Sequence, residues 1–175
     1  MKNEEKVNKI AALLEDMSPG FYPKPIFQQF SRLTVNPIIE VVPFRKTKDS
    51  GAEILLLERE PDDPIFAGQL HTPGTVVRPY DTPGSFNDAL QRIFNDELQG
   101  SKTSEPTFVT NIFHHSGRGL EASQIFWVEL LGPPKIGSFY PVSNLPKHLM
   151  HSQLDFIPIA IEHYLGSWAK NGESV

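Results

Sequence analysis

Three carboxylates between positions 81 and 97 have the types and spacing to hold a cation, with an arginine among them. Asp81 lies in a loop rich in proline and glycine, and Arg92, Asp96 and Glu97 follow in a segment with helical periodicity. At 100° per residue, Glu97 falls inside the arc of apolar residues, where an unpaired carboxylate would cost several kcal/mol to bury. Glu97 is therefore expected to meet an arginine or a metal ion, unless it reaches solvent at the helix end. The spacing of Arg92 and Asp96 also fits an ordinary surface ion pair.

The elements that must position these residues follow from the periodicity of the chain. One apolar face, formed by Phe86, Ala89, Leu90, Ile93 and Phe94, predicts a helix over 86–98. Runs of β-branched and aliphatic residues predict one hairpin before this helix and another after it. The predicted strands are 38–46, 53–60, 107–115, 122–131 and 139–142, with a turn at 47–52 that contains Asp49, helices at 3–17 and 155–169, and a connector at 21–33 whose short helix lies against the domain. This order predicts an α+β fold in which helices cover both faces of a mixed sheet.

The composition limits the classes of function. The chain has 175 residues, 16 Lys and Arg against 21 Asp and Glu, a net charge of −5, and no cysteine. These numbers indicate one acidic globular domain without disulfides, thiolate metal ligands or cysteine nucleophiles. Without a basic block we expect no nucleic acid polymer as a partner, and without a long apolar run we expect no membrane association. The expected location is cytoplasmic.

The segment His71–Gly100 resembles the Nudix box, whose signature combines a glycine loop with a helix bearing an arginine and several glutamates. Pro73 and Gly74 match the lead-in to the box, and Ala89 matches its helix entry. Arg92 and Glu97 are identical to signature positions, and Asp96 replaces a glutamate. Counted from Thr75, which stands at the glycine position, Asp81 stands at the first glutamate.

The segment also departs from the Nudix signature. Ile93 stands where the family has the glutamate that follows the arginine, and Gln99 stands where it has the final glycine. Ten residues rather than seven separate Asp81 from Arg92. Loss of a metal-ligating or general-base carboxylate commonly costs about 10²- to 10⁴-fold in rate. Ile93 therefore predicts altered or lost catalysis.

The resemblance implies a Nudix-like α/β/α sandwich over residues 35–175, preceded by an N-terminal helix and connector over 1–34. It implies a hydrolase that cleaves a nucleoside diphosphate-linked pyrophosphate with Mg²⁺ or Mn²⁺. The alternative is a catalytically degenerate Nudix-fold protein that acts as a nucleotide-binding or protein-interaction module. An unrelated α+β binding protein is a third hypothesis. The N-terminal helix, outside the usual Nudix core, is expected to pair two copies of the chain as a homodimer.

The resemblance also implies roles for single residues. Glu121, in the turn of the second hairpin, is either a replacement carboxylate or an exposed turn residue. Arginines near strand ends are candidates to clamp phosphate. His114 and His115, adjacent on a strand, point to opposite faces and cannot bind one ion together. The candidates are Glu97, Asp96 and Arg92 as catalytic residues, Asp96, Glu97, Asp81 and Glu121 as metal ligands, and Arg59, Arg78 and Gly74 as substrate-binding residues.

Overall fold

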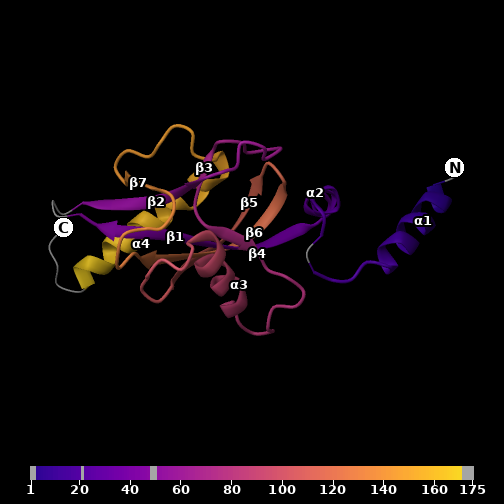
Figure 1. Ribbon diagram of the computed structural model, residues 1–175, viewed down its shortest axis with the longest axis horizontal. Helices are drawn as coiled ribbons and strands as arrows, with labels where there is room; N and C mark the ends of the chain where they lie inside the picture. Colours follow the sequence, from indigo (N-terminus) through magenta and orange to yellow (C-terminus); the bar gives the residue numbers. More distant parts are fainter. Residues whose placement is uncertain (1–2, 21, 48–50, 171–175) are drawn as a thin grey trace.

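A seven-stranded mixed sheet forms the centre of the computed structural model, which describes residues 3–20, 22–47 and 51–170 (Figure 1). Phe21 of the predicted connector and Asp49 of the predicted turn lie outside the described residues. The strands are β1 (Val35–Lys46), β2 (Ala52–Glu58), β3 (Leu70–His71), β4 (Gly74–Val76), β5 (Thr107–Ser116), β6 (Gly119–Glu129) and β7 (Ser138–Pro141). The helical segments are α1 (Asn3–Glu15), α2 (Lys24–Leu33), α3 (Asn87–Arg92), η1 (Ile93–Glu97), η2 (His151–Asp155) and α4 (Ile157–Lys170).

The strand order is β3-β2-β1-β6-β5, with β4 also paired to β1 and β7 to β2. Strands β1 and β2, and likewise β5 and β6, are antiparallel neighbours, which confirms both predicted hairpins. The parallel pair β1–β6 joins the two hairpins and runs from Val35↔Leu120 to Phe44↔Glu129. The mixed α+β sheet is thus confirmed.

The central strand β1 is buried on both faces, because successive side chains point to opposite sides of the sheet. Val42 and Phe44 pack in one apolar cluster with residues of α4. Ile39 and Val41 pack in a second cluster with α3 and Ile93. The two helices therefore cover opposite faces of the sheet, as the element order predicts.

The predicted continuous helix over 86–98 is wrong in its second half. An α-helix covers Asn87–Arg92, and a single π-helical turn follows over Ile93–Glu97. The backbone N–H of Leu98 donates to the carbonyl of Ile93, five residues earlier, at 2.9 Å. This wider turn places both Ile93 and Leu98 in the core with 0% of their surface exposed. A π-helical turn is common at functional sites.

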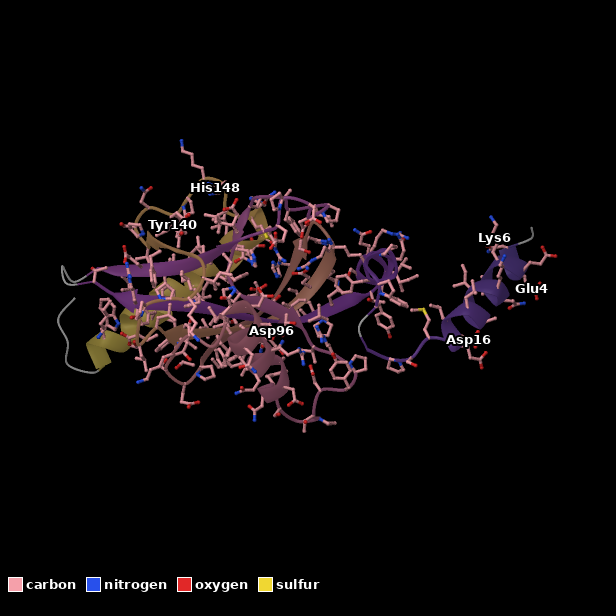
Figure 2. The ribbon with its side chains drawn as sticks, in the orientation of Figure 1. Glu4, Lys6, Asp16, Asp96, Tyr140 and His148 are labelled. Atoms are coloured by element: carbon pink, nitrogen blue, oxygen red, sulfur yellow. The ribbon has the colours of Figure 1, made fainter. Side chains whose placement is uncertain are left out.

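The N-terminal segment differs between its two helices. Helix α2 packs against β6 and β1, which confirms that the connector lies against the domain. A Cβ at Gly119 would lie 2.1 Å from the carbonyl oxygen of Ser31, so only glycine lets α2 approach β6 this closely. Helix α1 has no buried residue and lies away from the sheet, with Glu4 and Lys6 on it and Asp16 just after its end (Figures 1 and 2).

Among the helices that the structure describes, none is long and apolar enough to cross a membrane.

Candidate functional site

Asp81 and Arg92 form a part-buried ion pair that fixes the loop before α3. Arg92 donates to both carboxylate oxygens of Asp81 and, at 3.1 Å, to the carbonyl of Val76. The backbone N–H of Arg78 donates to the same carboxylate at 2.8 Å. The hydrogen bonds from Arg92 lower the pKa of Asp81, so this carboxyl is ionised at neutral pH. Arg92 therefore orders the loop through Asp81. Both oxygens of the Asp81 carboxylate already accept hydrogen bonds from protein groups.

Glu97 lies at the end of η1, half-buried, on the wall of a cavity of about 730 Å³. Burial raises the pKa of Glu97, the nearby guanidinium of Arg59 lowers it, and the charge of Asp96 raises it again. Arg59 lines the same cavity, so its positive charge acts on this half-buried acid. Asp96 lines the same cavity but is exposed, near the centre of the body in Figure 2.

The cavity beside Glu97, here called the acidic cavity, has an excess of negative charge. Its described lining contains six carboxylates against the cationic side chains of Lys24 and Arg59. His71 also lines it, and burial lowers the pKa of this imidazole to about 3, so His71 is neutral. The six carboxylates are those of Glu58, Glu60, Asp62, Asp63, Asp96 and Glu97.

Ile93 is a core residue. It is fully buried and packs with Ile39, Val41 and Val128 on the sheet. A carboxylate at position 93 in this conformation would enter an apolar cluster, at a cost of several kcal/mol. The isoleucine at this Nudix box position therefore has a packing role here.

Glu121 is not the exposed turn residue that was one of its two predicted alternatives. It lies within β6, with 2% of its surface exposed. Its carboxylate accepts a hydrogen bond from Ser116 Oγ at 2.7 Å and pairs with the guanidinium of Arg118 at 3.2 Å. Strand β6 begins at Gly119, three residues before the predicted strand, because Gly119 already pairs with Ser116 in the ladder. The turn is therefore limited to residues 117 and 118, and Glu121 belongs to the strand.

The four predicted metal ligands are not brought together in the described part of the chain. No group of three or more His, Asp or Glu side chains there is arranged to hold a metal ion. Asp81 is bound by Arg92, and Glu121 is bound by Arg118. Because Mg²⁺ and Mn²⁺ need several oxygen ligands in near-octahedral geometry, these side chains do not fit an all-protein site for either ion.

Arg59 and Arg118 both line a second cavity of about 530 Å³, here called the cationic groove. Burial lowers the pKa of Arg59 and the charge of Arg118 lowers it further, while the charges of Glu97, Glu40 and Asp63 raise it. Each guanidinium has a buried Nε without a hydrogen-bond partner among the described residues. Lys24 and Arg78 add positive charge to the described lining, and Asp63 is the one carboxylate there.

Asp63 is held by backbone hydrogen bonds. Its Oδ1 accepts from the N–H groups of Ile65 at 3.0 Å and Phe66 at 2.9 Å. Burial would raise the pKa of Asp63, but these bonds and the charge of Arg59 hold it below its usual value. The turn they form places Phe66 beneath Arg118, whose guanidinium lies 5.8 Å from the ring centroid.

The other two predicted substrate-binding residues lie apart from this arginine pair. Arg78 is at the edge of the cationic groove, where it donates to the hydroxyl of Tyr80. Gly74 pairs with Glu40 across the β1–β4 ladder. A Cβ at Gly74 would lie 2.6 Å from Glu40 Oε2, so the glycine makes room for this carboxyl group.

Glu40 is a buried acid that the sequence interpretation missed. Burial raises its pKa to about 8, although the hydrogen bond with Thr72 acts in the opposite direction. Thr72 Oγ1 lies 2.8 Å from Glu40 Oε2 and 2.7 Å from Gln153 Oε1. A hydroxyl has one hydrogen and an amide oxygen only accepts, so both bonds form together when Glu40 is protonated and donates. The available signal was a single acid inside the apolar run IIEVV of β1.

The two histidines predicted to point to opposite faces do so. His114 has 7% of its surface exposed, and His115 is exposed. His114 Nε2 lies 3.0 Å from Ser123 Oγ, and its Nδ1 lies 3.4 Å from a carboxylate oxygen of Asp155. The pair therefore cannot bind one metal ion together.

Known proteins resemble this chain in fold. No family model and no curated protein matches the sequence. The NUDIX domain of Shewanella oneidensis NrtR, solved in complex with ADP ribose, matches at 16% identity and a TM-score of 0.55, over 88% of this chain and 97% of that one. A mutT/nudix family protein from Listeria innocua matches at 15% identity and a TM-score of 0.60, over 78% and 99%.

An ADP-ribose pyrophosphatase from Streptococcus suis matches at 18% identity and a TM-score of 0.53, over 75% of this chain and 92% of that one. At these identities the likeness concerns the backbone, and chemistry must be argued from the site itself. The structural matches and the element order together show that the chain has the Nudix fold, as the segment 71–100 implied.

Proposed function

We propose that this chain is a Nudix-fold binding module for a phosphate-bearing small molecule of the nucleoside diphosphate class, held by Arg59 and Arg118. The observation that carries the proposal is that these two partly buried guanidinium groups line one cavity, with Arg118 held there by its ion pair with Glu121. Two like charges repel each other, and an anion between them removes the repulsion. Arginine presents a planar set of donors that matches phosphate oxygens.

The hydrogen-bonding capacity of the arginines supports the same function. Arg59 Nε and Arg118 Nε are buried without a partner in the described part of the chain. A buried donor without an acceptor costs about 1–3 kcal/mol, which a phosphate oxygen would recover. Lys24 and Arg78 increase the positive potential of the cationic groove.

The proposal assigns ligand binding without divalent-metal catalysis. The described carboxylates do not form a group of three metal ligands, and Ile93 is part of the core. Arg59 supplies the positive charge beside Glu97. The NUDIX domain of NrtR was solved with ADP ribose, so a ligand of this class is compatible with the fold.

Pyrophosphate hydrolysis is the second candidate function, and one observation favours it. The acidic cavity next to Arg59 contains Glu97, whose pKa is raised by burial. A carboxyl group with a raised pKa suits general acid–base catalysis near neutral pH. In that case Glu97 takes the proton of the attacking water. Mg²⁺- or Mn²⁺-dependent turnover that disappears in Glu97→Gln would establish this candidate.

The binding proposal is tested by calorimetric titration of inorganic pyrophosphate and ADP into wild type and Arg59→Gln, in buffer containing EDTA. We expect the substitution to weaken both ligands about 10- to 100-fold, because charge-assisted hydrogen bonds are lost. Arg32→Gln is the matched control, since Arg32 is exposed on α2 and bonded to Gln29. Equal affinities for wild type and Arg59→Gln would contradict the proposal.

A further inference from the structure

We infer that Ser116 is a positioning residue of the proposed anion site: its hydroxyl, together with the Glu121 carboxylate, holds Arg118 at the cationic groove. The inference rests on the proposed function, because Arg118 is one of the two arginines that the function assigns to the phosphate. It concerns the arrangement of this arginine and assigns no contact between Ser116 and the ligand.

The hydroxyl of Ser116 connects the backbone of Arg118 with the partner of its side chain. The backbone N–H of Arg118 donates to Ser116 Oγ at 3.2 Å. Ser116 Oγ donates to Glu121 Oε1 at 2.7 Å, and Arg118 Nη2 lies 3.2 Å from the same carboxylate oxygen. A serine has one hydroxyl hydrogen, and the contact with Glu121 is shorter than the 3.4 Å contact with the carbonyl of Gly119. The backbone and the guanidinium of Arg118 are therefore both tied to one hydroxyl group, the guanidinium through Glu121.

The Glu121 carboxylate is a fixed anchor for these contacts. Its residue has 2% of its surface exposed, and its other oxygen lies 3.7 Å from Nε2 of His114, which is also buried. A buried carboxylate is costly unless it is paired and hydrogen-bonded. Glu121 and Arg118 therefore stay together, and the guanidinium cannot swing away without leaving a buried charge unpaired.

The backbone on either side of Arg118 is packed against neighbouring segments. A Cβ at Gly117 would lie 2.8 Å from Ile65 Cγ2, and one at Gly119 would meet the carbonyl of Ser31 in α2. Arg118 thus projects from a turn that is enclosed between α2 and the turn at 64–66. All of these contacts use groups of the chain itself, so they fix Arg118 independently of any ligand.

The paired Arg118 still has N–H groups for an anion. A guanidinium carries five N–H donors, and Nε of Arg118 is buried without a partner among the described residues. The ion pair with Glu121 has no net charge, so the positive charge of the groove comes from Arg59, Lys24 and Arg78. Arg118 therefore contributes donors in a fixed direction. A side chain that is already fixed loses little freedom on binding, which strengthens affinity.

The test is a calorimetric titration of inorganic pyrophosphate into wild type, Ser116→Ala and Ser116→Thr. Ser116→Ala removes the hydroxyl and leaves every charge in place. The affinity should fall about three- to tenfold, because Arg118 must then be ordered on binding. Ser116→Thr keeps a hydroxyl and should restore the wild-type affinity. Ser104→Ala is the matched control, since Ser104 Oγ likewise accepts a backbone N–H, that of Glu129 at 2.9 Å, and lines neither cavity.

A second background distinguishes positioning from a general role in the turn. Arg118→Gln combined with Glu121→Gln removes both charges of the ion pair and leaves no buried charge unpaired. If Ser116 acts through Arg118, Ser116→Ala should cause no further loss of affinity in this background. An equal loss in both backgrounds would show that Ser116 only maintains the turn, and it would overturn the inference.

The outcomes also separate this inference from the proposed function. Unchanged pyrophosphate affinity in Ser116→Ala would overturn the positioning role and leave the arginine site intact. Failure of wild type to bind pyrophosphate would overturn the proposed function and the inference with it. Should Ser116→Ala or the double background fail to fold, Ser116→Thr is compared with Ser116→Val, which has nearly the same shape but no hydroxyl. Equal affinities of these two variants would overturn the inference.

Discussion

Replacing Glu40 with glutamine should remove a large part of the pH dependence of folding stability. Burial raises the pKa of Glu40 to about 8 from an ordinary value of 4.5. In the unfolded chain this carboxyl ionises near pH 4.5, whereas in the folded protein it stays protonated until about pH 8. The protonated form is the one that donates to Thr72. Wild type therefore loses stability as the pH rises from 4.5 toward 8.

The magnitude follows from the shift in pKa. Each pKa unit corresponds to about 1.4 kcal/mol, so the full window from 4.5 to about 8 amounts to a loss on the order of 5 kcal/mol. That is a large fraction of the 5–15 kcal/mol typical of a domain. In Glu40→Gln the side-chain amide replaces the carboxyl O–H as the donor to Thr72 and cannot ionise. The variant should match wild type near pH 4.5 and exceed it by a few kcal/mol at pH 9.

The assay is urea unfolding of wild type and Glu40→Gln at several pH values between 4.5 and 9. The difference between the two proteins at each pH isolates Glu40, because contributions such as that of neutral His71 cancel. Glu162→Gln, an exposed position on α4, is the matched control and should run parallel to wild type. A constant difference between wild type and Glu40→Gln across the range would refute the assignment of a proton to Glu40.

Three further substitutions test the packing, the loop and the N-terminal helix. Gly74→Ala should destabilise the protein by about 1–3 kcal/mol in thermal unfolding, because the new Cβ would overlap the buried carboxyl group, while Gly132→Ala, with open space around it, should be neutral. Asp81→Asn should lower the free energy of unfolding, measured in urea, by about 1–3 kcal/mol, because Arg92 would lack its charged acceptor. An unchanged urea midpoint would contradict the role of this ion pair in ordering the loop. Light scattering should give a dimer mass for wild type and a monomer mass for Ile10→Asp, because Ile10 is an apolar side chain that is 57% exposed on α1 and would be covered in the dimer. A monomer mass for wild type at all concentrations would contradict pairing through this helix.

The sequence predicted the local elements better than the long-range contacts. Both hairpins were predictable because apolar runs and turn residues are local signals. The parallel pairing of β1 with β6 was not predictable, since it joins Val35 to Leu120 and depends on packing of the whole sheet. The π-helical turn was missed because the standard 100° increment leaves Leu98 outside the apolar arc. Its burial beside Ile93 requires the wider turn.

The candidate site was predictable only in part. The position of Glu97 inside the apolar arc predicted burial, and the residue is half-buried in the cavity that Arg59 also lines. The placement of Arg59 and Arg118 in one cavity could not be predicted, because it brings together the end of β2 and the turn before β6. Glu121 was recognised as a candidate, but its burial depends on where the ladder between β5 and β6 begins.

The central claim is that the arginine pair binds a nucleoside diphosphate without a divalent metal ion. The most direct measurement is a calorimetric titration of ADP into wild type, once with EDTA and once with excess Mg²⁺, followed by chromatography of the recovered nucleotide. We predict that ADP binds in EDTA and binds no more tightly with Mg²⁺, because Mg²⁺ neutralises part of the diphosphate charge, and that the ADP is intact at the end. Binding that requires Mg²⁺, or conversion of the nucleotide during the titration, would contradict the account.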